Sequence, residues 1–325
     1  MKKIAIVCGG YSGEYEISVQ SAHMVSENLD TGKYRTWVIY IDKDQWYFLD
    51  DAKSRHPIDK ADFSLTLPQE TVHFDGVFNA IHGTPGEDGI LAAYFDLLDI
   101  PHTSSDMECA ALTFNKYLCN MVVQSLGIKV AKSFSFLKGE HIDKGHVIES
   151  LGLPLFVKPA KSGSSVGVSK VNSAADFKGA IEKAFEEGDR ILIEEFLDGR
   201  EFACGLYAKD GNLTAMPLAE IISKKDFFDY EAKYTPGMAD EISPPENLDP
   251  THDTQMKIIS SMLYRELGCK GLVRIDYMLT EAGLYFIEIN TIPGMSPASL
   301  VIKEAKAMGL TNAQLFDTMV EMMFG

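Results

Sequence analysis

The strongest constraint on the fold is the alternation of short apolar segments with amphipathic ones in the first third of the chain. Three apolar segments have the length and composition of buried strands: Ile4 to Cys8, Thr36 to Ile41 and Gly76 to Ile81. Apolar residues at helical spacing follow the first segment at 17–29 and the third at about 89–98. Strands that alternate with helices in this way predict a parallel sheet with helices on its faces, as in an α/β fold.

The other two thirds mix strands and helices less regularly. The middle third is predicted to contain helices over 114–126 and 176–187 and strands over 155–158, 167–171 and 190–196. The last third is predicted to contain strands over 201–208, 216–222, 272–279 and 284–290 and helices over 252–267, 299–308 and 312–323. The proline-rich stretch 226–250 has no periodicity, which is typical of a functional loop. We expect an α/β part followed by α+β parts, in three domains over 1–110, 111–200 and 201–325.

Composition excludes several classes of partner. The 325 residues carry a formal net charge of −17, which disfavours nucleic acid and anionic membranes as main partners. No apolar segment is long enough to span a bilayer, and the apolar run after Met1 ends at Gly9, too early for a secretory signal. The five cysteines are scattered and form no CxxC pair, which argues against a disulfide framework or a cysteine zinc site. We expect a cytoplasmic protein.

A glycine-serine loop is the first candidate site. Residues 158–167 read Lys-Pro-Ala-Lys-Ser-Gly-Ser-Ser-Val-Gly, directly after a predicted strand. Small residues let backbone N–H groups approach phosphate oxygens, Ser164 and Ser165 add hydroxyl donors, and Lys158 can reach a phosphate. The loop ends in neither GKS nor GKT and opens no helix, so it is neither a Walker loop nor a dinucleotide fingerprint. The alternative is a flexible hairpin turn.

Two neighbouring strands near the C-terminus carry alternating polar residues. Because side chains two apart share a strand face, Arg274 projects with Asp276, and Glu288 projects with Asn290. A short turn at 281–283 joins the strands, which predicts an antiparallel hairpin with these four side chains on one patch. Carboxylate and amide oxygens suit Mg²⁺ bound together with substrate phosphates. The alternative is a solvated face with an ordinary ion pair.

Four further segments contain candidate binding residues, each with a plainer alternative. The acids of 193–197 and Glu201 suit an adenine amino group and ribose hydroxyls, or only a charged surface. The glycine loop 9–18 lies between a strand and a helix but lacks GxGxxG spacing, and its Ser18 and acids could cap that helix. The loop 82–89 lies at the ligand end of a parallel strand, or is a tight turn. Residues 231–237 bring charges into the long loop, or belong to a disordered insertion.

These segments, in this order, resemble the D-alanine–D-alanine ligases of the ATP-grasp superfamily over nearly the whole chain. The matching motifs are GEYEIS at 13–18, HGTPGEDG at 82–89, VKPAKSGSSVG at 157–167, DYEAKY at 229–234, VRID at 273–276 and EINTIPGMSPASL at 288–300. The resemblance implies an ATP-grasp fold with a Rossmann-like N-terminal domain. It also implies ATP-dependent ligation of two D-alanines through D-alanyl phosphate, for peptidoglycan precursors.

The resemblance also implies roles in binding ATP and metal. Phosphates would be held by Lys116, Lys158, Ser165 and Lys233. Adenine and ribose would be held by Glu194, Glu195, Leu197 and Glu201. Two Mg²⁺ ions, or Mn²⁺, would be bound by Asp276, Glu288 and Asn290. The stretch 227–245 would close as a lid over the site when ATP and D-alanine bind.

The amino-acid subsites follow from the same resemblance. The first D-alanine would meet Glu14 and His82, and the carboxylate of the second would meet Ser299 and Leu300. Catalysis would use the set Glu14, Ser164 and Tyr234, with Arg274 and the N–H of Gly294 stabilising an oxyanion. Pro297-Ala298 replaces the histidine-containing spelling of some members, which leaves the second subsite open.

Other functions remain open at this stage. A ligase that takes D-serine or a hydroxy acid as second substrate would differ little, although Tyr234 favours D-alanine. A catalytically silent nucleotide-binding relative would not need Arg274, Asp276, Glu288 and Asn290 together. A Rossmann dehydrogenase does not fit the glycine spacing. The family implies a homodimer whose partners are otherwise small molecules.

Overall fold

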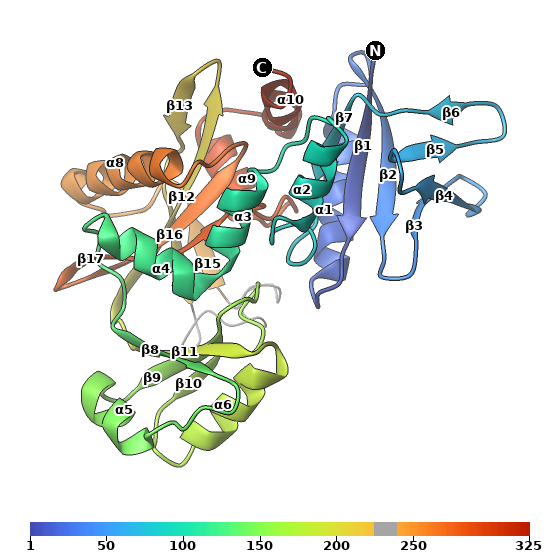
Figure 1. Ribbon diagram of the computed structural model, residues 1–325. Coiled ribbons are helices and arrows are strands. Elements are labelled where there is room, and N and C mark those ends of the chain that lie inside the picture. Colours follow the sequence, from blue (N-terminus) through green and yellow to red (C-terminus); the bar gives the residue numbers. More distant parts are fainter. Residues whose placement is uncertain (224–238) are drawn as a thin grey trace.

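Three β-sheets organise the chain in the computed structural model, which describes residues 1–223 and 239–325 (Figure 1). A seven-stranded sheet is built from the first 79 residues, a four-stranded sheet from residues 133–195, and a six-stranded sheet from residues 199–290. Within the described residues no helix is long and apolar enough to cross a membrane.

The centre of the first sheet is parallel, as predicted. β1 (Lys2–Gly9) lies between β2 (Tyr34–Ile41) and β7 (Gly76–Asn79), and both pairings are parallel. Helix α1 (Tyr15–Asn28) follows β1, and α2 (Ile90–Leu97) follows the loop after β7. The loops beyond the carboxyl ends of β1 and β7 therefore lie at one edge of the sheet, where parallel sheets hold ligands.

An antiparallel extension of this sheet was not predicted. It adds four short strands in the order β6-β5-β4-β3 beside β2: β3 (Trp46–Leu49), β4 (Arg55–Asp59), β5 (Ser64–Thr66) and β6 (Thr71–Val72). Figure 1 shows these strands reaching outward from the rest of the molecule. Each has too few residues for its alternation to be visible in the sequence.

The helix predicted over 114–126 is confirmed over 116–125, and a short helix that precedes it was not predicted. α3 (Met107–Phe114) ends at Asn115, and α4 (Lys116–Ser125) begins directly after it. Asn115 is extended, and its side chain accepts a hydrogen bond from the N–H of Leu118, so it caps α4. The break places Lys116 in the first turn of α4, where its backbone N–H donates to Ala160 O at 2.8 Å.

The four-stranded sheet is antiparallel throughout and covered by helices on one face. Its order is β10-β9-β11-β8, with β8 (Ser133–Leu137), β9 (Leu155–Pro159), β10 (Ser169–Val171) and β11 (Arg190–Glu195). Helices α5 (Lys144–Leu151) and α6 (Phe177–Glu186) lie below it in Figure 1. Val147 and Phe177 pack onto Leu155 in this core, so the opposite face is free to line a site.

The third sheet has the order β15-β14-β12-β16-β17, with β13 paired to β12. Its strands are β12 (Gly199–Lys209), β13 (Asn212–Ala215), β14 (Ala219–Ser223), β15 (Ala239–Ile242), β16 (Val273–Thr280) and β17 (Gly283–Asn290). The prediction of 226–250 as irregular is wrong where β15 pairs with β14, because Glu241 and its neighbours continue the ladder. Residues 227–238 of the predicted lid lie outside the described residues.

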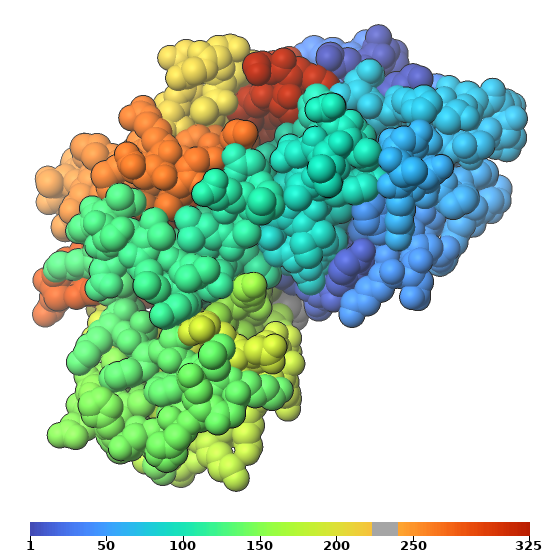
Figure 2. Space-filling view, in the orientation of Figure 1, coloured from blue at the N-terminus to red at the C-terminus, as the bar shows by residue number. Residues whose placement is uncertain are grey.

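The last of the C-terminal helices connects the first and third sheets, and Figure 2 shows the red C-terminal segment beside the blue N-terminal one. α8 (Pro250–Glu266), α9 (Leu300–Ala307) and α10 (Asn312–Met322) match the predicted helices closely. Phe316 on α10 makes an edge contact with Phe78 on β7, with ring centroids 6.2 Å apart. One hydrophobic core therefore contains residues from both ends of the chain.

Candidate active site

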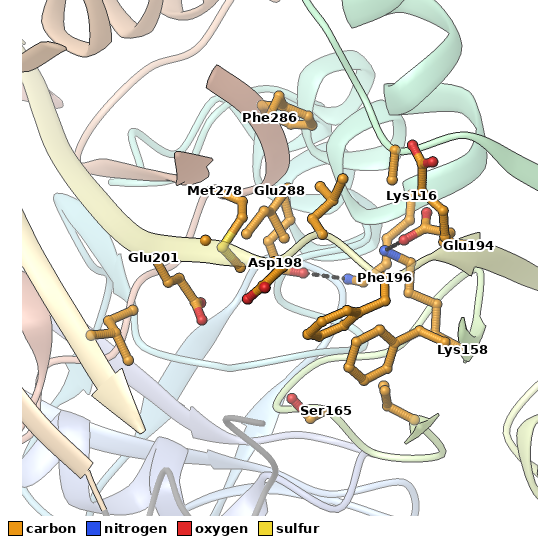
Figure 3. A pocket seen from close by; sticks show the side chains of 18 of the residues that line it. Lys116, Lys158, Ser165, Glu194, Phe196, Asp198, Glu201, Met278, Phe286 and Glu288 are labelled. Atoms are coloured by element: carbon orange, nitrogen blue, oxygen red, sulfur yellow. Dashed lines mark ion pairs between the residues drawn. The ribbon is translucent and has the colours of Figure 1, made fainter. Parts of the chain in front are cut away.

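The larger cavity of the site lies between the four-stranded and six-stranded sheets. Its volume is about 450 Å³, and its walls come from β9, β11, β12, β14, β16, β17 and α4. Its apolar surface is supplied by Phe156, Phe196, Leu197, Met278 and Phe286, and its charged end contains Lys116, Lys158 and Glu288. Figure 3 labels Phe196, Met278 and Phe286 among the apolar residues. An apolar slot that adjoins cations suits a nucleotide, and we call it the nucleotide cavity.

Both lysines in the nucleotide cavity are paired with carboxylates. Lys158 Nζ lies 2.5 Å from Glu194, and Lys116 Nζ lies 2.9 Å from Glu288 (Figure 3). Burial lowers the pKa of the part-buried Lys116 ammonium, but the carboxylates around it, chiefly that of Glu288, together outweigh this effect and raise the pKa. Asn120, on the next turn of α4, donates to Glu194 at 3.3 Å and was not predicted from the sequence.

The predicted phosphate loop, residues 158–167, contacts the loop between β1 and α1. Ser164 and Ser165 have φ of 47° and 59°, a left-handed conformation that side chains other than glycine rarely adopt. The Ser164 hydroxyl donates to the Glu14 carboxylate. A Cβ at Gly163 would lie 2.2 Å from Glu14 Oε2, so any larger residue there would have to displace the Glu14 carboxylate. The loop is therefore held in an unusual conformation against a residue 150 positions away.

The β16–β17 hairpin brings its polar residues together as predicted. Arg274 pairs in register with Asn290 and Asp276 with Glu288, and a β-bulge follows at Asp276/Tyr277. Arg274 Nε and Nη2 donate to the two Asp276 oxygens at 2.8 and 2.7 Å. Asn290 Nδ2 donates to Asp276 at 3.2 Å.

These residues can be tested against the chemistry of a metal site. In the described part of the chain, no three or more His, Cys, Asp or Glu side chains are grouped so as to hold a metal. The hairpin instead offers two carboxylates and one amide oxygen. That hard oxygen set fits Mg²⁺, which needs only one or two carboxylates when substrate phosphates and water complete its shell.

A second, smaller cavity adjoins the first. It measures about 120 Å³, and distant segments of the chain line it: Glu14, His82, Ser164, Arg274, Gly294 and Ser299 among them. Asp276, Glu288, Asn290 and Leu300 also line it. A Cβ at Gly294 would lie 2.9 Å from Ser299 Oγ, so glycine permits that close approach. We call it the amino-acid cavity.

His82 is held in a fixed tautomer at the wall of the amino-acid cavity. Its Nδ1 lies 3.0 Å from Ile292 O, which can only accept, so Nδ1 carries the proton. Nε2 then accepts from Ser21 Oγ at 3.1 Å. Burial lowers the pKa of His82, so the ring is neutral. Both ring nitrogens thus have protein partners, which indicates a positioning role.

Glu87 is a buried acid in this wall that was not predicted as a site residue. Its Oε2 accepts from Gly83 N at 2.7 Å. Burial, with the nearby Glu14 carboxylate, raises the pKa of Glu87 to about 8. The sequence HGTPGEDG contained this residue, but spacing alone does not distinguish a buried glutamate from an exposed one.

Most predicted site residues line one of the two cavities. Glu194, Glu195, Leu197, Glu201 and Ser165 line the nucleotide cavity. The Glu195 carboxylate accepts from Lys132 N at 2.8 Å, so its side chain is engaged outside the slot. Lys233 and Tyr234 lie outside the described residues.

Comparison with known proteins agrees with this geometry. Two family models match, "D-ala D-ala ligase N-terminus" over residues 3–105 and "D-ala D-ala ligase C-terminus" over residues 122–321. A D-alanine--D-alanine ligase of Flavobacterium johnsoniae is 44% identical over 99% of both chains. The chain belongs to the D-alanine–D-alanine ligase family. Another relative with that name, from Parabacteroides distasonis, is 41% identical over 98% of this chain and 97% of its own.

Solved structures place this ligase chain in the ATP-grasp fold. D-alanyl-alanine synthetase A of Vibrio cholerae aligns with a TM-score of 0.89 at 27% identity, over 100% of this chain and 99% of its own. The VanG D-Ala:D-Ser ligase of Enterococcus faecalis aligns with a TM-score of 0.86 at 32% identity, over 99% of both chains. A Bacillus anthracis D-alanine--D-alanine ligase, solved in complex with ATP, aligns at 0.80 with 26% identity, over 100% and 98%.

Proposed function

We propose that this ligase joins two D-alanines at the contact between its two cavities, using ATP to form D-alanyl phosphate. The observation that carries the proposal is that Ser164, Glu201 and Glu288 line both cavities. A γ-phosphate at the charged end of the nucleotide cavity would therefore face a carboxylate in the amino-acid cavity. Transfer between them needs no movement of either substrate across the protein.

ATP would bind with its adenine in the apolar slot and its phosphates at the lysines. Glu194 and the backbone near Leu197 would meet the adenine edge, and Glu201 the ribose. Lys116 and Lys158 would then exchange their carboxylate partners for phosphate oxygens. This exchange keeps each ammonium paired throughout, so little desolvation is added when ATP enters. Ser165 and Lys233 are assigned to the phosphates on family resemblance.

The hairpin would hold the divalent metal that the family uses. Asp276, Glu288 and Asn290 are the proposed ligands, and two Mg²⁺ ions is the proposed number. A divalent cation there supplies charge neutralisation to the transferring phosphoryl group. The same hairpin also carries Arg274, which lines the amino-acid cavity and would lie beside the reacting atoms there.

The reaction would proceed in two steps, each of which forms one bond and breaks another. A carboxylate oxygen of the first D-alanine bonds to the γ-phosphorus, and the bond to the β-phosphate oxygen breaks to release ADP. The amine of the second D-alanine then attacks the carbonyl carbon, and inorganic phosphate leaves. Arg274 and the N–H of Gly294 would stabilise the oxyanion that forms between these events.

The remaining residues would orient the two amino acids. Glu14 is assigned to the ammonium group of the first D-alanine, with His82 fixing the loop beside it. Ser299 and Leu300, at the start of α9, are assigned to the carboxylate of the second. Tyr234 would complete a hydrogen-bonded set with Ser164 and Glu14. The hydrogen bond between Ser164 and Glu14 supports this set for two of its three members.

Three wider properties are part of the same proposal. The enzyme would act in the cytoplasm, where ATP is available. It would form a homodimer, as the family resemblance implies. Its three functional parts would follow the three sheets, with boundaries near residues 110 and 200.

A D-serine acceptor is the second candidate, because the VanG D-Ala:D-Ser ligase aligns over 99% of this chain. Phosphate release tests both. The enzyme with ATP and Mg²⁺ is assayed with D-alanine alone, and with D-alanine plus D-serine, D-lactate or L-alanine, and products are identified by mass. We expect D-alanyl-D-alanine as the main product in every mixture. A main product containing D-serine or D-lactate would reassign the acceptor, and no phosphate release would overturn the proposal.

A further inference from the structure

Two cysteines from distant parts of the chain meet outside the active site. Cys109, in the first turn of α3, and Cys269, between α8 and β16, have their sulfur atoms 3.6 Å apart. Both residues are buried, at 2% and 7% exposure. The ligation chemistry proposed above uses neither of them, so their contact needs a separate explanation.

The surroundings of this pair make Cys109 the more acidic of the two thiols. Hydrogen bonds with the Cys269 thiol and the Ser105 hydroxyl lower the pKa of Cys109 below its usual range, against the opposing effects of burial and the Asp106 carboxylate. Cys109 also lies at the N-terminal end of α3, where the helix dipole favours negative charge. The hydrogen bond with Cys109 and burial raise the pKa of Cys269. Cys109 is therefore the thiol of the pair that ionises first.

The other cysteines of the chain have different surroundings. Cys8 and Cys204 are fully buried, and desolvation raises the pKa of each thiol far above its usual range. Burial raises the pKa of Cys119 to about 12. These three residues provide internal references, because they share the burial of the pair without its stabilised thiolate.

A large cavity gives solvent a route to Cys269, and Cys109 lies directly behind it. It measures about 460 Å³, opens to the surface and is lined by Cys269 together with His102, Tyr264 and Met319. It shares no lining residue with the nucleotide or amino-acid cavity. A molecule as small as hydrogen peroxide fits in this cavity beside Cys269, whose sulfur atom is 3.6 Å from that of Cys109.

We propose that Cys109 and Cys269 are a hydroperoxide-reactive pair that closes to a reversible disulfide. The Cys109 thiolate attacks one peroxide oxygen, the O–O bond breaks, and hydroxide leaves with the proton that Cys109 has lost, as water. The Cys269 thiol then attacks the sulfenic sulfur, an S–S bond forms, and a second water leaves. Two thiols are oxidised and one peroxide is reduced, with no other reactant.

The reaction requires only a small movement. The sulfur atoms must approach from 3.6 Å to about 2.05 Å, which side-chain rotation can supply. The bond would join α3 to the chain five residues before Arg274. The disulfide would therefore tie α3, the helix before Lys116, to the segment before Arg274, without contacting either residue. The pair is independent of the proposed function, so its test does not require ligase activity.

The test is peptide mapping of the whole, folded enzyme. Protein is treated with hydrogen peroxide, quenched with catalase, alkylated under denaturing conditions and digested without reductant. We expect one cross-linked product that joins the peptides of Cys109 and Cys269, with a mass two hydrogens below their sum. Dithiothreitol should remove it, and Cys8 and Cys204 should be alkylated as in the untreated enzyme.

Single substitutions separate the two thiols. In Cys269→Ser, Cys109 should form a sulfenic acid that dimedone captures, whereas Cys204→Ser should cross-link like the wild-type enzyme. Circular dichroism of each variant confirms that it is folded. The proposal is overturned if both thiols stay free in peroxide-treated wild-type enzyme, or if the cross-link joins Cys119 instead. It is equally overturned if dithiothreitol does not restore the thiols.

Discussion

The two cavities of the active site are built in opposite ways. The nucleotide cavity lies between two sheets formed by residues 133–290, with α4 alongside, and its slot is largely apolar. The amino-acid cavity is about a quarter of that volume, and its walls combine residues of strands β12, β14, β15, β16 and β17 with residues of the loops after β1, β7, β9 and β17. One is a gap between two sheets, and the other lies where loops from distant parts of the chain meet one sheet.

This difference suggests how a chain with a net charge of −17 receives an anionic substrate. In the nucleotide cavity each lysine is neutralised by one glutamate, and phosphate can replace that glutamate. The amino-acid cavity is lined by six acidic residues and a single arginine, Arg274; the acids are Glu14, Glu87, Glu201, Glu241, Asp276 and Glu288. A zwitterionic amino acid suits such a site better than a polyanion does. Substitutions in the two cavities should therefore affect different kinetic constants.

The largest effect is expected at the wall that the cavities share. Glu288→Gln keeps the shape of the side chain but removes the charge that pairs with Lys116 and that would bind metal. We expect kcat to fall by about 10³-fold or more, because both phosphoryl transfer and the attack of the amine would depend on the Glu288 carboxylate. Steady-state kinetics at saturating Mg²⁺ provides the measurement, with circular dichroism as a folding control. Wild-type turnover would show that catalysis does not depend on the Glu288 carboxylate in the shared wall.

The next substitution separates the nucleotide cavity from the amino-acid cavity. Lys158→Met removes one cation from the charged end of the slot. The KM for ATP should rise roughly 30-fold, the size of one charge-assisted hydrogen bond, while the KM for D-alanine changes less than about 3-fold. Lys178→Met is the matched control, because Lys178 is on the exposed face of α6, with its side chain 86% exposed. An equal change in both constants would contradict the separation.

A glycine substitution acts on the amino-acid cavity instead. In Gly163→Ala the new methyl group would lie 2.2 Å from Glu14 Oε2, so the Ser164–Glu14 contact must open. We expect kcat/KM for D-alanine to fall about 10-fold, with a smaller change in the KM for ATP. Gly179→Ala, in α6, has nothing within 4 Å of its added Cβ and should be neutral or slightly stabilising. Unchanged kinetics of Gly163→Ala would mean that this loop contact does not order the site.

The sequence predicted some of this site and missed other parts for identifiable reasons. The shared face of Arg274, Asp276, Glu288 and Asn290 followed from their alternation, because side-chain direction in a regular strand follows sequence parity. Helix α3 was missed because eight residues carry little periodicity. The strands β3 to β6 were missed because two to five residues carry too little pattern.

Burial and pairing were harder still to predict. Asn120 and Glu87 became site residues only when the fold placed them beside Glu194 and Glu14. The Cys109–Cys269 contact joins positions 160 apart, a relation that scattered cysteines do not reveal. Such contacts depend on tertiary packing, to which local periodicity gives no access.

The smallest expected effect concerns stability rather than catalysis. It tests whether Glu87, an acid of the amino-acid cavity, is protonated in the folded protein. Burial raises the pKa of Glu87 to about 8 from an ordinary value near 4.5. Between these values the folded protein holds a proton that the unfolded chain has lost, so the free energy of unfolding falls as pH rises from about 4.5 to 8. Glu87→Gln should make this fall at least about 1 kcal/mol smaller in urea titrations. A pH dependence equal to that of the exposed control Glu182→Gln would contradict a protonated acid in this cavity.

The central claim, direct phosphoryl transfer across the shared wall, can be followed with an isotope. D-alanine labelled with ¹⁸O in its carboxylate is incubated with ATP, Mg²⁺ and the enzyme, and the phosphate released is analysed by mass spectrometry. If the carboxylate attacks the γ-phosphorus, one labelled oxygen leaves with each inorganic phosphate when the amine of the second D-alanine displaces it. We therefore expect ¹⁸O in the released phosphate. Dipeptide formation with unlabelled phosphate, or with label in a nucleotide, would contradict the account.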